Sequence, residues 1–340
     1  SDAFSLKPAT NAVTDQEMDG RAPCSRCGAC LFGCPSRSIY DSAYEIPALR
    51  RFPNFRYLGD HFVRAIVSDD GHHALDVETK GMRRLIRAPI LVMAAGTLAT
   101  TPLILRRLKW IDRAVRLLTN PAAATAFVVP HLIGAARPQY AFSLGQLFYR
   151  LHEASAAGVI YGADALPLDL FAARLPLSRP ASLQLSEAMA PALLVANCYL
   201  PGELSQNIMR VTKDGETNIE GRSSDEGRAA LRTAVAELRR QMRKLGAFSV
   251  PGTTSDLPPG ADAHYGGTLP MGGTTPLATS EIGELRDMAN LFIVDGSVLP
   301  RLPATHPTLT IMANADRIGA EIAHRLAADK DVPGASRLTA

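Results

Sequence analysis

The chain has 340 residues, of which 46% are apolar, so it is long and apolar enough for about two domains with a sizeable core. Its 36 basic and 33 acidic residues leave a net charge of +3, which argues against nucleic-acid binding because that needs a clustered basic face. Residues 1–20 are polar and charged, so no signal peptide is visible and a cytoplasmic protein is predicted. The longest uncharged run, 117–136, is interrupted by prolines, and no transmembrane helix is expected.

The sequence predicts both strands and helices along the chain. An apolar strand at 85–93 runs into the small-residue turn at 94–96 and a helix, which is the pattern of a buried strand in an α/β sheet. The clearest helix is 225–245, because its apolar residues recur at spacings of three and four and Gly246 marks its end. The other predicted strands are 55–59, 62–67, 74–79, 193–199, 207–212 and 290–295, and the other predicted helices are 102–108 and 307–326.

Four of the five cysteines lie close together with the spacing C-x2-C-x2-C-x3-C-P. Bacterial ferredoxins use this spacing for iron–sulfur ligands, because tight loops of small residues let several thiolates surround one cluster. The cluster would hold three irons (3Fe-4S) on three thiolates, or four (4Fe-4S) with Cys34 or the distant Cys198 as the fourth ligand. A four-thiolate zinc site and a loop of unligated thiols are the alternatives. The candidate metal ligands are Cys24, Cys27, Cys30 and Cys34.

Two histidines near the C-terminus begin similar turns. His264 begins the segment HYGGTLPMGG, and His306 begins HPTLTIMANA, with the predicted strand 290–295 and a turn between them. An imidazole titrates near neutral pH and therefore suits proton transfer. The layout is that of two side chains that converge on one reacting centre.

These C-terminal segments resemble the glucose–methanol–choline (GMC) family of flavin oxidoreductases almost segment for segment. The stretch LVMAAGTLATTPLIL (91–105) resembles the family's strand, turn and helix against the flavin. The Cys-rich run followed by Gly-Cys-Pro resembles bacterial dehydrogenase members, in which it can carry an iron–sulfur cluster. The specific motifs are HYGGTLPMG (264–272), NLFIVDGSVLP (290–300) and HPTLTIMANADRIGAEIA (306–323), within a resemblance that covers roughly residues 20–327.

The resemblance implies FAD as the cofactor and a set of site residues. His264 would act as the general base that takes the alcohol proton while hydride leaves for the flavin, and His306 would hydrogen-bond the substrate oxygen. A helix that opens after His306 would present its positive end to the reduced flavin. The residues that the resemblance places at the flavin are Ala95, Gly96, Asp295, Gly296, Pro307 and Thr308.

The implied fold is α/β plus α+β, with a partial, Rossmann-like FAD-binding domain that lacks its N-terminal βαβ half and an antiparallel-sheet substrate domain. The chain has no Gly-x-Gly-x-x-Gly turn for the ADP moiety, and residues 36–39 lack the lysine that the family carries there. Since the chain also begins with Ser, we expect a separate segment or protein chain to supply the missing half. The expected domains are a partial flavin-binding domain with the Cys cluster (1–110), a substrate-binding domain (111–255), a return to the flavin-binding domain (256–330) and a tail (331–340).

The leading prediction is an FAD-dependent dehydrogenase module of a split or truncated enzyme, which oxidises an alcohol or sugar-like hydroxyl. Electrons would leave the flavin through the cysteine-bound cluster. The sparse charge of residues 121–200 favours a small, uncharged substrate, and it also fits a domain core or a docking surface. The alternatives are an incomplete part of an ordinary enzyme, and a flavin-free GMC-derived protein that acts as an isomerase, dehydratase, cyclase or binding subunit.

Overall fold

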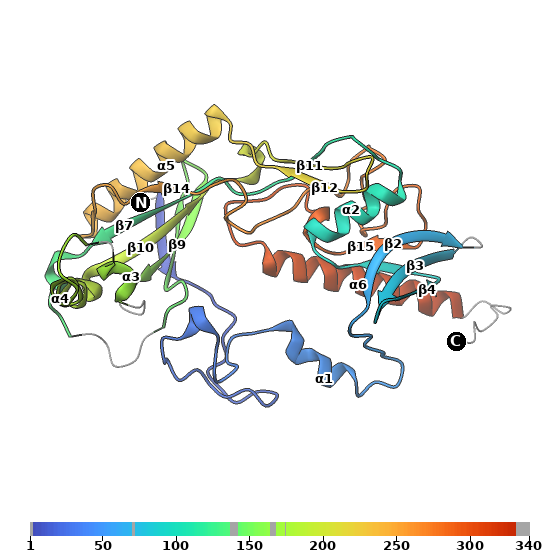
Figure 1. Ribbon diagram of the computed structural model, residues 1–340, viewed down its shortest axis with the longest axis horizontal. Coiled ribbons are helices and arrows are strands. Elements are labelled where there is room, and N and C mark those ends of the chain that lie inside the picture. Colours follow the sequence, from blue (N-terminus) through green and yellow to red (C-terminus); the bar gives the residue numbers. More distant parts are fainter. Residues whose placement is uncertain (1–2, 70–71, 137–141, 164–167, 174, 331–340) are drawn as a thin grey trace. The chain divides into compact units, whose positions relative to one another are not determined.

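The computed structural model describes residues 3–69, 72–136, 142–163, 168–173 and 175–330, so the expected tail at 331–340 lies outside the described residues. The chain divides into two compact units, whose segments can be followed by colour in Figure 1. Each unit collects three stretches that are far apart in the sequence. Unit 1 comprises Ser1–Gly59, Ala122–Leu200 and Asp225–Pro258, and unit 2 comprises Asp60–Pro121, Pro201–Ser224 and Pro259–Ala340.

Unit 1 is built on a seven-stranded antiparallel sheet. The strand order is β1-β8-β9-β10-β7-β13, and β14 pairs with β7 as well. Alternate residues of the central strands are buried, which is the period-two pattern of a sheet with a covered face. The strands are β1 (Phe4–Pro8), β7 (Ala122–Val128), β8 (Leu147–Leu151), β9 (Ala156–Gly162), β10 (Leu193–Tyr199), β13 (Phe248–Ser249) and β14 (Ser255–Asp256).

One long helix, α5 (Asp225–Lys244), packs on this sheet and contacts β7, β8 and β10 (Figure 1). Its buried apolar residues repeat every three or four positions and form one stripe, as the sequence predicts. The helix ends before Gly246, whose φ of +80° is the left-handed conformation that favours glycine. The shorter helices of unit 1 are α1 (Ile46–Leu49), α3 (Asp169–Ala172) and α4 (Arg179–Met189).

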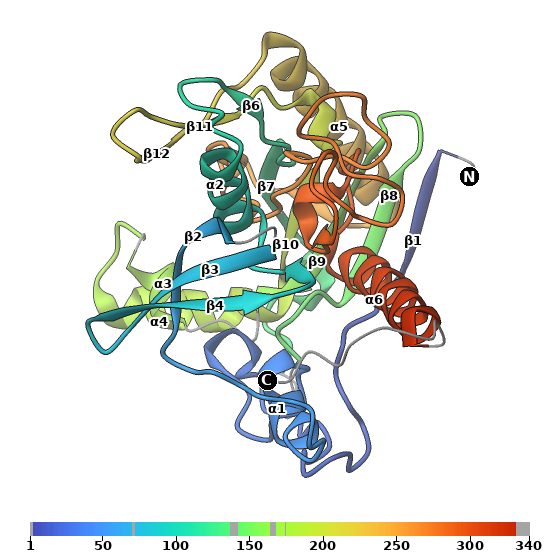
Figure 2. The ribbon, with the colours of Figure 1, turned by 90° about the vertical axis from the view of Figure 1, so that its right-hand side faces the viewer.

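Unit 2 combines two antiparallel three-stranded sheets with one short parallel pair. The strands β2, β3 and β4 form a meander, which Figure 2 shows side by side, and the second sheet has the order β12-β11-β6. In the parallel pair, Leu91 of β5 lies opposite Leu291 of β15. The elements are β2 (Phe62–Asp69), β3 (His72–Thr79), β4 (Met82–Ala88), β5 (Leu91–Met93), β6 (Val115–Arg116), β11 (Ile208–Val211), β12 (Thr217–Glu220), β15 (Leu291–Ile293), α2 (Thr97–Arg107) and α6 (Thr308–Lys330).

The core of unit 2 lies where α2 packs against the parallel pair. Ile104 and Leu105 of α2 are fully buried in the same cluster as Leu291 and Ile293 of β15. Each such side chain contributes roughly 2 kcal/mol by its removal from water. Because β5 and β15 are parallel, they end at the same edge of the pair, and the turns that follow them carry predicted site residues.

The mixed α/β fold with antiparallel sheets is the predicted class, and α5, α6 and β10 lie within a few residues of their predicted positions. The single strand predicted at 85–93 is wrong. It is two strands, β4 and β5, separated by Pro89, which has no N–H to donate to a sheet. The strand predicted at 55–59 is also wrong, since these residues form turns and irregular backbone. The helix predicted at 102–108 begins earlier, at Thr97.

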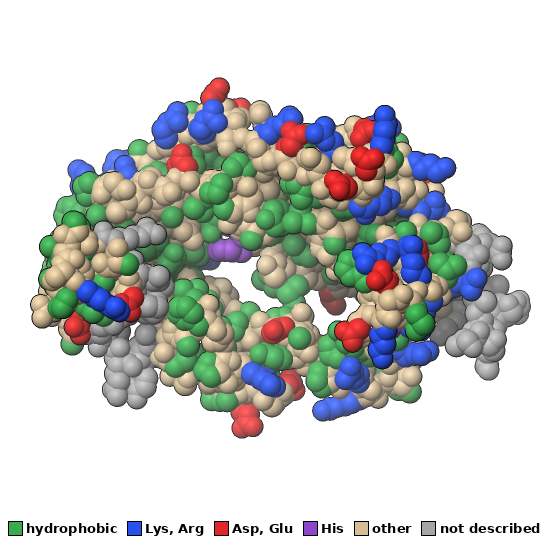
Figure 3. Space-filling model, viewed as in Figure 1, with side chains coloured by type: hydrophobic (Ala, Val, Ile, Leu, Met, Phe, Trp, Pro, Cys, Tyr) green, Lys and Arg blue, Asp and Glu red, His purple; other side chains and the backbone are tan. Residues whose placement is uncertain are grey.

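Charged side chains of both signs lie beside each other on α5 and on the β2–β3–β4 sheet (Figure 3). On α5, Arg240 contacts Glu237 at 2.7 Å, and on the sheet Arg64 contacts Glu78 at 2.9 Å. These elements therefore show no single-sign patch within the described residues. None of the helices in the described part of the chain has the length and apolar character needed to cross a membrane.

Gly158 of β9 is a point of close packing in unit 1. It lies opposite Tyr149 of β8, whose hydroxyl donates a hydrogen bond of 2.8 Å to the carbonyl oxygen of Asn197 on the other side. A Cβ at position 158 would lie 1.7 Å from that oxygen and 2.9 Å from the Tyr149 ring. The contact leaves no room for any side chain at this position.

We expect Gly158→Ala to lower the free energy of unfolding by about 3 kcal/mol or more, because backbone and a buried aromatic ring must both move. Denaturant unfolding monitored by circular dichroism measures this loss. The matched control is Gly319→Ala in α6, where a Cβ meets no atom within 4 Å, so the change should be neutral or stabilise by about 0.5–1 kcal/mol. Equal effects of the two substitutions would contradict the packing described for β9.

Candidate active site

The loop that carries His264 is held in place by backbone hydrogen bonds on two sides. Gly266 and Leu118 exchange two N–H···O bonds, of 3.0 and 3.1 Å. On the other side, the N–H of Gly267 donates to the carbonyl oxygen of Gly296 at 3.2 Å. Gly267 has a φ of +73°, and a Cβ there would lie 2.5 Å from the Leu118 side chain. The loop is therefore rigidly placed within unit 2.

A buried carboxylate joins the turns that follow β5 and β15. Asp295 is 7% exposed, and its Oδ2 accepts hydrogen bonds from the N–H of Gly96 (3.0 Å) and the hydroxyl of Thr100. Its Oδ1 accepts from the N–H (3.0 Å) and the hydroxyl of Ser297. Thr97, the first residue of α2, donates through its hydroxyl to the carbonyl oxygen of Tyr265 at 2.8 Å. These bonds connect the two turns to the residue beside His264.

The two predicted histidines meet. The ring centroids of His264 and His306 are 5.3 Å apart with an interplanar angle of 89°, so one ring presents its edge to the other. His306 lies two residues before the start of α6, and the segment leading to it is fixed by a hydrogen bond of 2.7 Å from the N–H of Gly202 to the carbonyl oxygen of Leu302. Two imidazoles at this distance can both reach one bound oxygen atom.

Asn120 bonds to both histidine-bearing segments. Its Oδ1 lies 3.0 Å from Nδ1 of His264. Its Nδ2 donates to the carbonyl oxygens of Pro303 (3.1 Å) and Leu302 (3.5 Å), shortly before His306. Asn120 is only 2% exposed, so these contacts are made away from water.

Asp262 fixes the backbone of the same two residues. Its Oδ2 accepts hydrogen bonds from the N–H of Asn120 (2.7 Å) and the N–H of His264 (3.3 Å), and it lies 3.7 Å from Nδ1 of His264. Burial raises the pKa of Asp262 above its usual range, although the N–H bond from Asn120 and the other backbone hydrogen bonds act in the opposite direction. A buried carboxyl with several backbone donors is typical of a residue that orders a loop.

The protein environment keeps both rings neutral over a wide pH range. Burial, and secondarily the neighbouring His306, lower the pKa of His264 to about 4, and its side chain is 13% exposed. His306 keeps an exposed face, and the protein that covers the rest of its ring lowers its pKa. A neutral imidazole has a free lone pair, which is the form that accepts a proton.

The segments predicted to lie at the flavin converge in unit 2. Gly96 is joined to Asp295 as described, and a Cβ on Gly296 would lie 2.9 Å from the Thr97 hydroxyl and 3.4 Å from the Ile311 side chain of α6. The turns after β5 and β15 and the start of α6 therefore meet around Gly296. Of the predicted flavin residues, Ala95 and Thr308 are exposed, Gly96 is half-buried, and Asp295, Gly296 and Pro307 are buried.

Exposed apolar side chains adjoin these segments. Val92 of β5 is 44% exposed and Leu98 of α2 is 37% exposed, whereas most apolar residues of these two elements are buried. Leu309 and Met312, in the first turns of α6, are 76% and 44% exposed. The first N–H groups of a helix also lack intrahelical partners. An open apolar surface beside a helix N-terminus fits a flat, partly anionic ring system such as a flavin.

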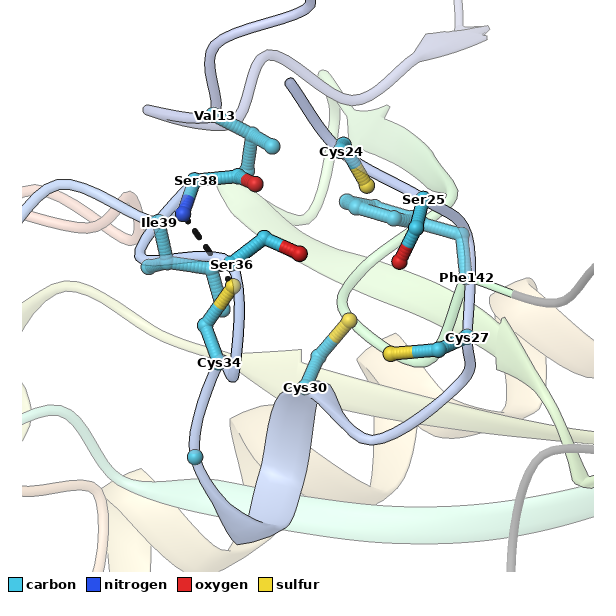
Figure 4. A pocket seen from close by; sticks show the side chains of 11 residues that line it. Val13, Cys24, Ser25, Cys27, Cys30, Cys34, Ser36, Ser38, Ile39 and Phe142 are labelled. Carbon is cyan, nitrogen blue, oxygen red and sulfur yellow. Dashed lines mark hydrogen bonds between the residues drawn. The ribbon is translucent and has the colours of Figure 1, made fainter. Parts of the chain in front are cut away.

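The four cysteines predicted as metal ligands line one small pocket of unit 1 (Figure 4). In this view the sulfur atoms of Cys27 and Cys30 point toward each other, whereas Cys34 points toward the backbone of Ser38. Among the described residues, which include all four cysteines, no group of three His, Cys, Asp or Glu side chains is placed to hold a metal ion. The iron–sulfur and zinc interpretations stay predictions.

Cys34 differs from its neighbours in its hydrogen bonding. The N–H of Ser38 donates to its sulfur at 3.2 Å. Burial acts to raise the pKa of Cys34, but hydrogen bonds from the backbone of Ile39 and from Ser38 outweigh it, and the pKa lies below the usual value. A thiol with a lowered pKa is a better metal ligand and nucleophile than an ordinary one. Cys198, by contrast, is fully buried in β10, as expected of a core residue.

Comparison with known proteins identifies the family. Residues 205–315 match a family model described as GMC oxidoreductase, and this range includes both histidines. The region of residues 205–315 is therefore similar to GMC oxidoreductases, and two curated oxidases and one solved oxidase structure resemble the chain as well.

Two curated GMC-type relatives are oxidases. The C-glycoside 3-oxidase of Microbacterium trichothecenolyticum is 27% identical over 298 residues, which are 82% of this chain and 55% of that protein. The 6'''-hydroxyparomomycin C oxidase of Streptomyces lividus is 33% identical over 101 residues, which are 29% of this chain and 18% of that protein. The chain thus spans little more than half the length of the C-glycoside 3-oxidase.

A solved structure shares the fold. Pyridoxine 4-oxidase from Mesorbium loti superposes with a TM-score of 0.57 at 15% identity, over 78% of this chain and 57% of that one. At this identity the likeness shows a common fold. It is consistent with the predicted partial FAD-binding domain combined with antiparallel sheet.

Asn120 and Asp262 are not among the site residues predicted from the sequence. The Asn120-Pro121 pair is a turn signal, but it gives no indication of a contact with a histidine 144 positions away. Asp262 stands two residues before His264, and a short side chain at that spacing often accepts a backbone N–H. That local signal could have marked Asp262.

The lowered pKa of His264 gives a prediction for stability. Between pH 6.5 and 4 the unfolded chain binds a proton at this position and the folded chain does not, so stability falls as pH falls through this window. We expect the wild-type protein to lose about 2 kcal/mol more than His264→Gln between pH 7 and pH 5. Urea unfolding at the two pH values measures the difference. The same pH dependence in both proteins would mean that His264 titrates normally.

Proposed function

We propose that this chain is the catalytic part of an FAD-dependent oxidoreductase that converts an alcohol or sugar-like hydroxyl group into a carbonyl. The observation that carries the proposal is the pair of neutral imidazoles, His264 and His306, 5.3 Å apart beside the turns after β5 and β15. The GMC family supports a flavin as cofactor.

The two histidines have different roles at the substrate hydroxyl group. His264 takes the hydroxyl proton on Nε2, because its Nδ1 is engaged with Asn120. His306 hydrogen-bonds the same oxygen and orients the C–H bond of the alcohol carbon. Bound FAD supplies the acceptor for the hydride that leaves this carbon. The substrate thereby loses one proton and one hydride, and a carbonyl group results.

The residues that would hold the flavin end of the cofactor are those that meet around Gly296. The turn at Ala95 and Gly96 and the turn at Asp295 and Gly296 would offer backbone groups to the flavin end of the cofactor. The α6 N-terminus at Pro307 and Thr308 offers N–H groups and a positive dipole end. Thr308 is exposed, which supports this role.

A further segment or protein chain would supply the half that binds the ADP moiety. Two observations support this part of the proposal: the chain spans 55% of the C-glycoside 3-oxidase, and unit 2 exposes the apolar side chains of Val92, Leu98, Leu309 and Met312. In the complete enzyme these side chains would be covered by protein and cofactor. A cytoplasmic location remains part of the prediction.

A sugar-like hydroxyl is the substrate class that we favour. One relative is named as a C-glycoside oxidase and another as an oxidase of a paromomycin compound, and few charges occur in residues 121–200 of this chain. We propose that the four cysteines would hold an iron–sulfur cluster, which would offer the electrons a dehydrogenase-type exit, with molecular oxygen as the competing acceptor.

We expect His264→Ala to reduce turnover by about 100-fold or more, the usual loss for a general base. The measurement is anaerobic bleaching of the flavin absorbance by sugar-like alcohols, on protein completed with its ADP-binding half. His306→Asn should keep more activity than His306→Ala, because an amide still donates to the substrate oxygen.

The matched control is His324→Ala, which removes an exposed histidine from α6 and should leave bleaching unchanged. If the flavin of His264→Ala bleached at the wild-type rate, His264 would not be the general base. Turnover that needs His264 but persists without flavin would instead support the flavin-free isomerase, dehydratase or cyclase.

Iron and acid-labile sulfide analysis tests the cysteine proposal. We expect stoichiometric iron and sulfide in protein purified without oxygen, and their loss in Cys30→Ser. Cys198→Ser is the control, because this buried thiol lies in β10 away from the loop. Zinc at one equivalent, or no metal at all, would contradict the iron–sulfur assignment and leave oxygen as the acceptor.

A further inference from the structure

We propose that Asn120 is a positioning residue that holds His264 in one tautomer and ties it to the segment carrying His306. The inference rests on the proposed function only for its catalytic consequence, since the tautomer itself is a property of the folded chain. Asn120 lies outside every motif that marks the family in this sequence, and its role follows from its hydrogen bonds.

The orientation of the Asn120 amide is determined by its neighbours. Carbonyl oxygens accept hydrogen bonds and cannot donate them, so the group facing Pro303 and Leu302 must be the NH₂ of Asn120. Its oxygen therefore faces His264, 3.0 Å from Nδ1. Because this oxygen is an acceptor, Nδ1 must carry the proton.

The consequence for His264 is a lone pair on Nε2. A neutral imidazole has one N–H and one acceptor nitrogen, and the first is engaged with Asn120. The reactive nitrogen is thus Nε2, the ring nitrogen that does not bond to Asn120. Without Asn120, both tautomers would be accessible, and a fraction of molecules would present N–H where a base is required.

The same amide couples the positions of the two rings. The carbonyls that receive its NH₂ belong to residues 302 and 303, and His306 follows three residues after Pro303. One side chain therefore sets the His264 ring at one end and the entry to His306 at the other. The 5.3 Å ring separation depends on both bonds.

Asp262 joins the backbone segments of Asn120 and His264. Its Oδ2 accepts the N–H groups of both Asn120 and His264, so the two backbones are held at a constant spacing. The titratable groups beside the His264 ring include Asp262, at 3.7 Å, and His306. The carboxyl would also favour the positive charge that His264 acquires when it takes a proton.

Nitrogen-15 NMR of histidine-labelled protein tests the tautomer directly and needs neither flavin nor substrate. Above pH 6, where His264 is neutral, its Nδ1 should show the shift of a protonated nitrogen and its Nε2 that of a bare one. His264→Gln identifies the signal among the eight histidines by removing it. A bare Nδ1 in the wild-type protein would overturn the proposal without any variant of Asn120.

Two substitutions at position 120 distinguish the hydrogen bond to His264 from the bonds to the carbonyl oxygens of residues 302 and 303. Asn120→Ala should release the tautomer and lower kcat at least about tenfold with little change in KM, because substrate binding does not use this residue. Asn120→Asp keeps an oxygen toward Nδ1 but loses the NH₂, so it should retain the Nδ1–H tautomer and recover part of kcat. A protonated Nδ1 of unchanged intensity in Asn120→Ala would overturn the proposal.

The control is Asn207→Ala, which removes another buried amide of the same region. Asn207 donates to the hydroxyl of Thr119 at 2.8 Å and accepts from the N–H of Arg222 at 2.7 Å. This substitution should leave the His264 tautomer unchanged, and a shift equal to that of Asn120→Ala would contradict a specific role for Asn120. If the tautomer behaves as stated but the completed protein oxidises no alcohol, the proposed function fails and the positioning role stands.

Discussion

The buried carboxylate of Asp295 is the constraint on which the rest of unit 2 depends. It accepts four hydrogen bonds, from two backbone N–H groups and two hydroxyls, on the turns that follow β5 and β15. A buried charge is costly unless every such bond is made, so the two turns are held together as one unit. Thr97 extends this arrangement to the carbonyl oxygen of Tyr265, the neighbour of His264. The position of the candidate base is thus set by a carboxylate that never contacts it.

The candidate site is a second polar network built on that support. Asn120 Oδ1 faces Nδ1 of His264, and Asp262 accepts the backbone N–H groups of both residues, with the His264 ring 5.3 Å from that of His306. Burial keeps both imidazoles neutral, which is the state that a proton acceptor needs. Charge and geometry therefore favour the same proposed chemistry, removal of a proton from a hydroxyl group, for which a flavin of the kind the GMC family uses would accept the hydride.

Much of this site could be predicted from local sequence, and the remainder could not. The two histidines stand in contiguous motifs, and α5 can be predicted from its apolar spacing and its terminal glycine. The break at Pro89 is harder to predict, because a continuous apolar run conceals the end of one strand and the start of the next. Asn120 has no local signature at all. Its role arises from partners 144 and 183 positions away, which only the folded chain brings together.

The central claim is that His264 and His306 act on one hydroxyl oxygen beside the flavin. A crystal structure of the completed, flavin-loaded protein with an unreactive sugar-like alcohol tests it most directly. We expect the hydroxyl oxygen to lie within about 2.6–3.2 Å of Nε2 of His264 and within hydrogen-bonding reach of the His306 ring. An alcohol bound elsewhere, or a His264 ring that offers Nδ1 to the ligand, would contradict it.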